Sequence, residues 1–218
     1  MCDGVLPIKN KGLCITCEKK IRYVKDPRCM KCGKPISSED EYCKDCRGRE
    51  HKFIQGRAVF DYGTMAESLH RFKNKGRAEY AETYARLISE REKDWLCAIK
   101  PDAFIPVPIH KKKLRQRGYN QSACLSKELS KITNIPTLEN VVIRENHTSP
   151  LKNLSLRERQ NNLKNAFKLC TNDVKLTTIV IVDDIYTTGS TIDEISATIK
   201  DKFPCRIYFL TLAVGRGI

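Results

Sequence analysis

The stretch Ile179-Val180-Ile181-Val182-Asp183-Asp184-Ile185-Tyr186-Thr187-Thr188-Gly189-Ser190-Thr191 decides the fold. Its first four residues are β-branched and apolar without alternation, which is typical of a strand buried on both faces of a parallel sheet. Two adjacent carboxylates follow where this strand ends, and such acids can hold sugar hydroxyls or a hydrated Mg²⁺. The hydroxyl-rich turn after them opens onto a predicted helix, whose N-terminus favours an anion. The stretch therefore predicts one site for a sugar, a phosphate and a metal.

Length and composition limit what can surround this stretch. The chain has 218 residues, which at roughly 150 residues per domain allows one domain with a smaller appendage or two modest domains. Apolar residues make up 40% of it, which is enough for a core and too many for a disordered chain. No apolar run approaches the roughly 20 residues that cross a bilayer, and the N-terminus lacks the apolar segment of a signal peptide. We therefore expect a cytoplasmic protein without a membrane span.

The charge of the chain is strongly basic. Its 40 Lys and Arg residues outweigh 26 Asp and Glu residues, which gives a formal net charge of +14. Such an excess favours phosphates, nucleic acid or acidic surfaces as partners. The densest basic run is 111–117, directly after a predicted strand at 102–108. Because ligands of open α/β sheets bind outside the carboxyl ends of the strands, we expect this run to face a ligand.

Cysteine pairs dominate the N-terminal part of the chain. Eleven cysteines in a chain expected to be cytoplasmic favour metal binding over disulfides. Three pairs have Cys-x-x-Cys spacing: Cys14/Cys17, Cys29/Cys32 and Cys43/Cys46. Two such pairs on tight turns place four thiolates tetrahedrally around Zn²⁺. The predicted ligands of this zinc ribbon are Cys29, Cys32, Cys43 and Cys46.

Cys14 and Cys17 have no matching pair. Cys2 precedes Cys14 by about the spacing between the two pairs of the first site, so a second metal site is predicted with Cys2, Cys14 and Cys17 as three of its ligands. His51 is an alternative fourth ligand, although a single His after a ribbon is more often a surface residue. We place the cysteine-rich module at residues 1–55 and a second domain at residues 56–218.

Strand and helix patterns alternate from residue 57 to the end, which predicts βαβ units and a mostly parallel α/β sheet. Strands are expected at 57–62, 102–108, 139–144, 179–182 and 206–214. Helices are expected at 65–72, 78–91, 120–132, 154–167 and from Thr191, which forms a capping box with Glu194. The side chains expected to face the core from these helices are Tyr80, Tyr84, Leu87, Ile88, Cys124, Leu125, Leu129, Ile132, Ile192, Ile195 and Ile199.

The opening stretch resembles the phosphoribosyl-pyrophosphate (PRPP) binding loop of type I phosphoribosyltransferases. In that family the acid pair binds the ribose 2′ and 3′ hydroxyls, and the following loop binds the 5′-phosphate. The resemblance implies Asp183 and Asp184 as the catalytic acids, with Mg²⁺ accompanying PRPP. The residues implied for the phosphate are Thr187, Thr188, Gly189, Ser190 and Thr191. Lys73, Arg115 and Arg117 are expected to face the pyrophosphate, and Arg159 to close over the site.

Nearly the whole chain resembles the ComF family of competence-associated proteins. The matching segments are Cys29-x-x-Cys32-Gly33-x-Pro35, Phe72-Lys73-x-x-Gly76, Pro106-Val107-Pro108 followed by Arg117-Gly118-Tyr119-Asn120-Gln121, Leu154-Ser155-x-x-Glu158-Arg159-x-x-Asn162 with Ala166-Phe167, and the PRPP-type loop. The resemblance implies a type I phosphoribosyltransferase-like, doubly wound sheet with an N-terminal zinc ribbon. It also implies a role in handling single-stranded DNA during natural transformation, with other competence proteins as partners. Two departures are the missing half of a fourth cysteine pair and Leu151, where relatives often carry Gln.

Other functions stay open beside this one. The chain can be an active phosphoribosyltransferase of unknown acceptor, in which pyrophosphate is displaced from the anomeric carbon of the sugar through positioning and electrostatics. It can also be a non-enzymatic DNA-binding or adaptor protein, because basic patches bind a nucleic-acid backbone without regard to sequence. The DNA-binding candidates are Lys111, Lys112, Lys113, Arg157 and Arg159.

Overall fold

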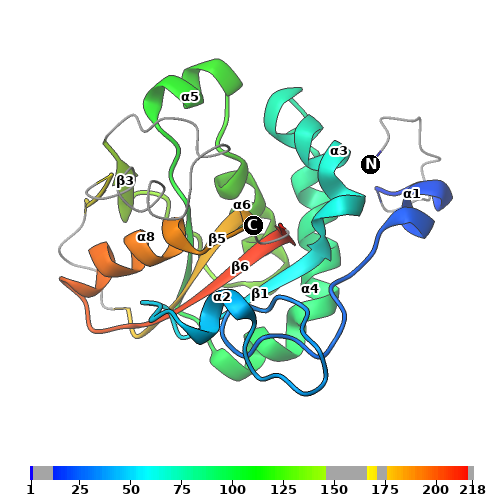
Figure 1. Cartoon of the computed structure of the whole chain (residues 1–218). Coiled ribbons are helices and arrows are strands. Elements are labelled where there is room, and N and C mark those ends of the chain that lie inside the picture. Colours follow the sequence, from blue (N-terminus) through cyan, green and yellow to red (C-terminus); the bar gives the residue numbers. More distant parts are fainter. Residues whose placement is uncertain (2–11, 146–165, 171–175, 216–218) are drawn as a thin grey trace.

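A four-stranded parallel sheet forms the centre of the computed structural model, which describes residues 1, 12–145, 166–170 and 176–215. The strand order is β1-β6-β5-β2, and all neighbours run parallel (Figure 1). The strands of this sheet are β1 (Gln55–Asp61), β2 (Ala103–Pro106), β5 (Thr178–Tyr186) and β6 (Arg206–Val214). A separate antiparallel pair consists of β3 (Val142–Arg144) and β4 (Phe167–Leu169). The expected α/β class with a mostly parallel sheet is confirmed.

Helices cover both faces of the sheet. One face carries α3 (Tyr62–Asn74), α4 (Tyr80–Ile99) and α6 (Gln121–Thr133), and the other carries α8 (Ser190–Lys200) (Figure 1). Because side chains alternate along a strand, Val180 and Val182 of β5 pack towards the three helices, whereas Ile179 and Ile181 pack towards α8. All four are fully buried. The predicted doubly wound arrangement is therefore present.

The part of the cysteine-rich module that carries Cys29 to Cys46 shares the second face of the sheet with α8, whereas Leu13, Ile21 and Tyr23 pack against the cluster on the first face. The module's short helices are α1 (Ile15–Lys20) and α2 (Lys44–Arg47). Phe53, just after the module's cysteines, is 1% exposed and packs edge-on against Phe209 of β6 at 4.9 Å between ring centroids. Val24 belongs to the same apolar cluster, together with the ribbon cysteines Cys29, Cys32 and Cys46. The module thus covers part of the sheet that would otherwise face water.

Most expected elements form where the patterns place them, but several details differ. α4 runs on to Ile99 beyond the expected end at 91, and β3 begins at Val142 instead of 139. Ile132, one residue before the end of α6, is 47% exposed instead of buried. The capping box is wrong: α8 starts at Ser190, and its N-cap is Gly189, which makes no side-chain capping bond. The helix expected at 154–167 lies outside the described residues except at its end, where Phe167 belongs to β4.

Among the described helices, none is both long and apolar enough to cross a membrane.

Tyr80, Tyr84, Leu87 and Ile88 are buried on one face of α4, as expected for core residues. α5 (Lys111–Arg117) follows β2 and has no buried residue. It stands above the carboxyl ends of the strands (Figure 1).

Candidate functional site

Near the carboxyl end of β5, the side chains of Asp183 and Asp184 contact residues of α6 and α3. Asp183 Oδ1 accepts a hydrogen bond from Ser122 Oγ at 3.0 Å and another from the Asp184 N–H at 2.9 Å. Asp184 Oδ2 lies 2.8 Å from Lys73 Nζ. Ser122 is in the first turn of α6 and Lys73 is in the last turn of α3. The acid pair is therefore held by both helices that flank the end of the strand.

The environment makes Asp183 an unusual acid. Burial and the neighbouring Asp184 carboxylate raise the pKa of Asp183 to about 7, although the Lys73 ammonium opposes the rise. Two adjacent carboxylates away from bulk water are stabilised by a cation or by groups that donate hydrogen bonds. Sugar hydroxyls and hydrated Mg²⁺ both offer such groups, so the acid pair fits either ligand.

Basic side chains surround the acid pair. Burial lowers the pKa of Lys113, and the nearby Arg144, Arg117 and Lys73 lower it further. Burial also lowers the pKa of Arg144, while Asp183 opposes this shift. Beside the effect of burial, these three neighbours of Lys113 show that several cations lie close together here, and Asp184 offsets only part of their repulsion. An anionic ligand is therefore electrostatically favoured here.

A cleft of about 630 Å³ opens beside the acid pair, between α3 and α5. Lys73, Lys113 and Arg117 line it together with the apolar Leu69 and Ile185. A chain of hydrogen bonds fixes its basic wall. Arg117 Nη1 donates to Gln121 Oε1 at 3.1 Å, and Gln121 Nε2 donates to the Lys73 carbonyl at 3.1 Å.

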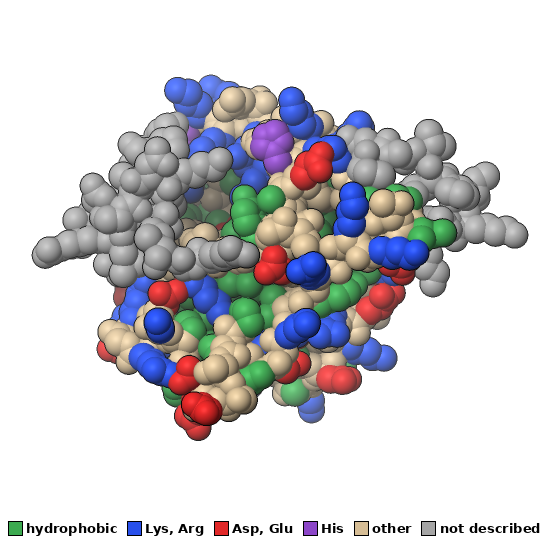
Figure 2. Space-filling view, turned by 45° about the vertical axis from the view of Figure 1, so that its right-hand side comes forward, with side chains coloured by type: hydrophobic (Ala, Val, Ile, Leu, Met, Phe, Trp, Pro, Cys, Tyr) green, Lys and Arg blue, Asp and Glu red, His purple; other side chains and the backbone are tan. Residues whose placement is uncertain are grey.

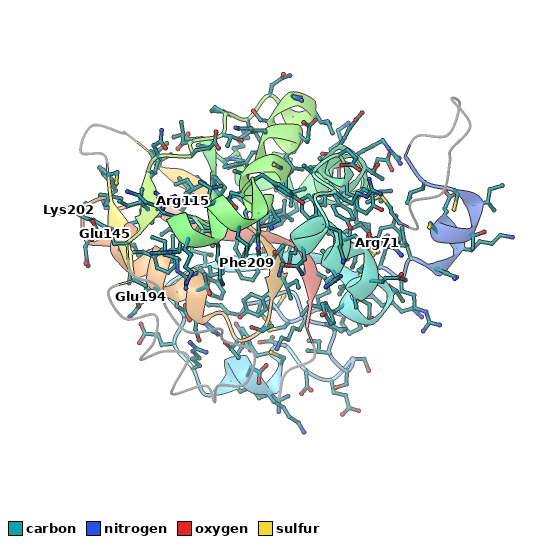
Figure 3. The ribbon with its side chains drawn as sticks, turned by 90° about the horizontal axis from the view of Figure 1, so that it is seen from above. Arg71, Arg115, Glu145, Glu194, Lys202 and Phe209 are labelled. Atoms are coloured by element: carbon teal, nitrogen blue, oxygen red, sulfur yellow. The ribbon has the colours of Figure 1, made fainter. Side chains whose placement is uncertain are left out.

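The structure brings some of the residues predicted to contact pyrophosphate into the cleft, but not all of them. Lys73 and Arg117 share the cleft, whereas Arg115 is exposed on α5 and does not line it (Figure 3). Arg159 lies outside the described residues. Lys113, expected only as a DNA contact, lines the cleft, and Arg144 was not expected at the site at all.

The loop between β5 and α8 forms a small pocket of its own, lined by residues 185–192 and Asp183. Gly189 has φ +79°, and a Cβ there would lie 2.6 Å from the Tyr186 hydroxyl. Thr188 Oγ1 and Ser190 Oγ are 3.1 Å apart. The backbone N–H groups at the start of the 11-residue α8 point out of the helix at this position. Together they make a cradle suited to a phosphate.

The four ribbon cysteines form a separate cluster. The sulfurs of Cys29, Cys32, Cys43 and Cys46 all lie within 4.8 Å of one another. A tetrahedral Zn²⁺ with Zn–S bonds of about 2.3 Å separates its sulfurs by about 3.8 Å, and Cys32 Sγ lies 3.6 Å from Cys43 Sγ. Hydrogen bonds with Cys32 and Cys46 lower the pKa of Cys29, while the bond with Cys29 raises the pKa of Cys32. Four cysteine sulfurs at these distances are suited to be the ligands of one Zn²⁺ ion.

The predicted second metal site is only partly described. Cys14 is the N-cap of α1, and the Cys17 N–H donates to its sulfur at 3.4 Å. Cys2 lies outside the described residues. α1 stands beside α3, well apart from α2 of the first site (Figure 1). His51 is 6% exposed, and its Nε2 lies 3.5 Å from Cys46 Sγ of the first site, so it is neither a surface residue nor placed for the second site.

Basic residues expected to contact DNA gather above the sheet. Lys111 and Lys112 are exposed on α5. In Figure 2, basic side chains line the upper edge of the visible face and are also spread over its lower half, where most of the visible acidic side chains lie. Arg157 and Arg159 lie outside the described residues.

Several contacts of the site were not found from the sequence. Ser122 and Gln121 follow a helix cap, where polar residues are ordinary. Arg49, in the linker after the ribbon, donates to the Thr188 carbonyl at 2.7 Å. No spacing rule connects a linker arginine with a loop so far along the chain.

Comparisons with known proteins agree with both parts of the chain. Residues 1–47 match the family model of a double zinc ribbon domain. The chain is 35% identical over 205 residues to Competence protein F of Haemophilus influenzae, covering 91% of this chain and 89% of that protein. It is 32% identical over 202 residues to the DNA utilization protein YhgH of Escherichia coli strain K12, with 90% and 87% covered. Competence protein ComFC of Bacillus subtilis is 27% identical over 203 residues, with 88% and 80% covered.

Among solved structures, an adenine phosphoribosyltransferase aligns with a TM-score of 0.38 and 12% identity. The alignment covers 75% of this chain and 83% of that chain.

Proposed function

This chain belongs to the ComF family of competence proteins, and we propose that it binds PRPP with Mg²⁺ and handles single-stranded DNA during natural transformation in the cytoplasm. Its relatives are named as competence and DNA utilization proteins. One observation carries the proposal: the acid pair, the basic cleft and the small pocket of the hydroxyl-rich loop lie at the end of one strand. Each part matches one portion of PRPP.

The ribose portion is assigned to the acids. Asp183 and Asp184 accept hydrogen bonds, which suits the two hydroxyls of ribose. The 5′-phosphate is assigned to the loop residues Thr187, Thr188, Gly189, Ser190 and Thr191, at the start of α8. The contact between Ser122 and Asp183 fixes the orientation of one acid before the sugar arrives.

The pyrophosphate portion is assigned to the cleft. Lys73 and Arg117 line it from opposite elements, and Lys113 adds a third cation. Carboxylate and phosphate oxygens are the ligands that Mg²⁺ prefers, and this ion would neutralise part of the pyrophosphate charge when bound. Turnover of PRPP would in addition need an acceptor that reaches the anomeric carbon from the side opposite the pyrophosphate.

A second candidate activity, binding of single-stranded DNA, is supported by α5. This helix has five basic residues and no acidic ones among its seven. Lys113, Gln116 and Arg117 of this helix line the cleft, and Lys111, Lys112 and Arg115 are exposed. Neutralising several phosphates at once gives affinity that is independent of sequence and falls as salt rises.

PRPP titration with Mg²⁺ tests the proposal on the wild-type protein and on Asp183→Asn/Asp184→Asn. We expect PRPP affinity to fall at least about tenfold in the double variant, because two contacts to the sugar are weakened. The matched control, Asp94→Asn/Asp201→Asn, changes two exposed acids away from the site and should bind as the wild type does. Equal affinity of the site variant and the wild type would refute PRPP binding at the acids.

Single-stranded DNA binding is measured separately over a salt series on the same proteins. We expect wild-type affinity to fall steadily with salt and the acid-pair variant to bind DNA at least as tightly as the wild type does. Absence of binding at low salt would refute the DNA-binding part and leave the PRPP part intact.

A further inference from the structure

The linker between the ribbon and β1 is bonded to the phosphate loop. Arg49 supplies most of these contacts: Nη1 donates to the Thr188 carbonyl at 2.7 Å, and Nη2 lies 3.4 Å from Ser190 Oγ. The same Nη2 lies 3.1 Å from Asp193 Oδ2 in the first turn of α8. The side chains of Arg49 and Asp193 are each only 15% exposed. One arginine from the ribbon side thus holds both the loop and the helix that follows it.

His51 continues this connection to the metal site. Its Nδ1 lies 2.9 Å from Asp193 Oδ2, and its Nε2 lies 3.5 Å from Cys46 Sγ. Asp193 Oδ1 also accepts the Lys52 N–H at 2.9 Å. The Asp193 carboxylate is therefore contacted by three groups of the linker, from Arg49, His51 and Lys52. A ribbon cysteine and the phosphate loop are separated by only His51, Asp193 and Arg49.

An aromatic stack provides a second connection. His51 stacks on Phe53 with 4.6 Å between ring centroids, and Phe53 meets the edge of Tyr186 at 6.4 Å. Tyr186 ends β5 and lies stacked on Phe209 at 4.6 Å and 5°. Its hydroxyl fills the space beside Gly189. The polar and aromatic contacts reach the same loop from the same linker.

We propose that Arg49 and His51 are positioning residues that allow the zinc ribbon to hold the phosphate loop in its anion-binding shape. This inference rests on the proposed function, because it takes the loop at Thr188 and Ser190 to bind a sugar phosphate. Metal binding at the four cysteines and phosphate binding at the loop then strengthen each other.

Two physical effects produce this coupling. Asp193 places a negative charge in the first turn of the helix whose N-terminus would hold the phosphate, and the Arg49 guanidinium neutralises it. Arg49 also ties down the Thr188 carbonyl, so the loop does not have to be ordered when the ligand binds. Because energetic coupling between two sites is reciprocal, a metal that raises phosphate affinity is itself bound more tightly by the phosphate complex.

Arg49→Ala tests the polar connection, with ribose 5-phosphate as the probe because its phosphate is the group assigned to the loop. We expect its affinity to fall about tenfold. Arg49→Lys should restore part of it, since a lysine keeps the charge but loses the two-pronged contact. The matched control is Arg47→Ala, whose side chain pairs with Asp40 on the ribbon surface and does not touch the loop.

A second readout separates positioning from loss of structure. Mg²⁺-pyrophosphate is assigned to the cleft at Lys73, so its affinity should be the same in Arg49→Ala and in the wild type. Equal losses of ribose 5-phosphate and pyrophosphate affinity in Arg49→Ala would overturn the inference in favour of a general structural defect. Asp193→Asn provides a second variant: it frees Arg49 but also removes a negative charge beside the phosphate. We therefore expect a smaller loss of ribose 5-phosphate affinity than in Arg49→Ala, with pyrophosphate binding unchanged.

Reciprocity supplies the decisive test. Zinc affinity is measured by competition with a chromogenic chelator, with and without ribose 5-phosphate. We expect the sugar phosphate to raise the zinc affinity of the wild type and to have no such effect on Arg49→Ala. If ribose 5-phosphate does not change the zinc affinity of the wild type, this inference is overturned while the proposed function stands. Failure of the wild type to bind both PRPP and ribose 5-phosphate would overturn the proposed function, and this inference with it.

Discussion

Lys73 Nζ lies 2.8 Å from Asp184 Oδ2, which joins the end of α3, where Lys73 lines the cleft, to the end of β5. The side chains are 25% and 12% exposed, so water screens the pair less than it screens a surface ion pair. An arriving Mg²⁺ or sugar hydroxyl competes with Lys73 for Asp184. The displaced ammonium is then next to the cleft, where a phosphate would lie.

Lys73→Ala should therefore weaken PRPP binding in the presence of Mg²⁺ by about 10- to 100-fold. This range corresponds to the loss of one charge-assisted contact, about 1.5–3 kcal/mol. Calorimetric titration measures it, and Lys75→Ala is the control because Lys75 is exposed just past the end of α3. If Lys73→Ala binds PRPP as tightly as Lys75→Ala does, Lys73 does not contribute to PRPP binding.

Gly189→Ala should deform the phosphate loop. The residue has φ +79°, and a methyl group would lie 2.6 Å from the Tyr186 hydroxyl. We expect a loss of about 1–3 kcal/mol in unfolding free energy, together with weaker ribose 5-phosphate binding. Gly48→Ala is the control: Gly48 has φ −109° and open space around it, so its unfolding free energy should change by less than about 0.5 kcal/mol. Urea unfolding of both variants decides the matter.

Asp102 should make stability depend on pH. Its Oδ2 accepts hydrogen bonds from the N–H groups of Thr178 and Thr177 at 2.8 and 2.7 Å and from Thr177 Oγ1 at 2.9 Å. These bonds, led by that from Thr178, lower the pKa of Asp102 below its ordinary value. A lowered folded-state pKa gives stability that is present above the unfolded-state value of about 3.9 and is lost as pH falls through the folded-state value.

Asp102→Asn should therefore cost about 1 kcal/mol of unfolding free energy at pH 7, a modest figure because the side chain is exposed. The difference from the wild type should shrink as pH falls below about 4. Urea unfolding at a series of pH values measures it, with the exposed Asp201→Asn as control. A difference that grows towards low pH would contradict the assignment.

Zinc removal should be visible at the single tryptophan. Trp95 Nε1 donates to Gln55 Oε1 at 2.9 Å, and Gln55 Nε2 donates to the carbonyl of Met30, between Cys29 and Cys32, at 3.1 Å. We expect at least about one Zn²⁺ per chain by elemental analysis. A strong chelator should change Trp95 fluorescence as the metal leaves, because the ribbon folds with its metal. Cys32→Ser should show the changed spectrum from the start, while Cys97→Ser, an exposed cysteine elsewhere on α4, should not.

Lys111→Ala/Lys112→Ala should lower the salt dependence of single-stranded DNA binding. Each lost phosphate contact reduces the slope of log affinity against log salt by about 0.7, so two should reduce it by about 1.4. Fluorescence anisotropy with a labelled oligonucleotide measures the slope. Lys200→Ala/Lys202→Ala, at the far end of α8 from the phosphate loop, should leave it unchanged. The same slope in the α5 variant and the wild type would exclude this helix from the DNA surface.

Local patterns predicted what local forces decide. The apolar run at Ile179 predicted the buried central strand, and the cysteine spacing predicted the four-sulfur cluster that the structure forms. Both depend on residues close together in the sequence. Helix ends were predicted less well: the left-handed Gly189 starts α8 in place of the expected Thr191 cap, because the loop conformation is set by Tyr186 beneath it.

Contacts between distant segments could not be predicted in this way. Arg144 and Ser122 reach Asp183 only because β3 and α6 fold back to the end of β5. His51 looked like a surface residue, yet it is enclosed between Cys46 and Asp193. A single sequence holds no periodic signal for such meetings, since they are fixed by how the elements pack.

The strand order has a consequence for how this protein is made. Among the described residues, β1 pairs only with β6 in the central sheet, so the strand that follows the ribbon finds its neighbour far along the chain. During synthesis on the ribosome, β1 and Phe53 can reach their partners in β6 only after residues 206–214 have emerged. A ribbon that has already captured its metal gives the waiting segment a folded anchor during translation. Nascent chains stalled before Arg206 should therefore depend on chaperones, and should do so most when zinc is scarce.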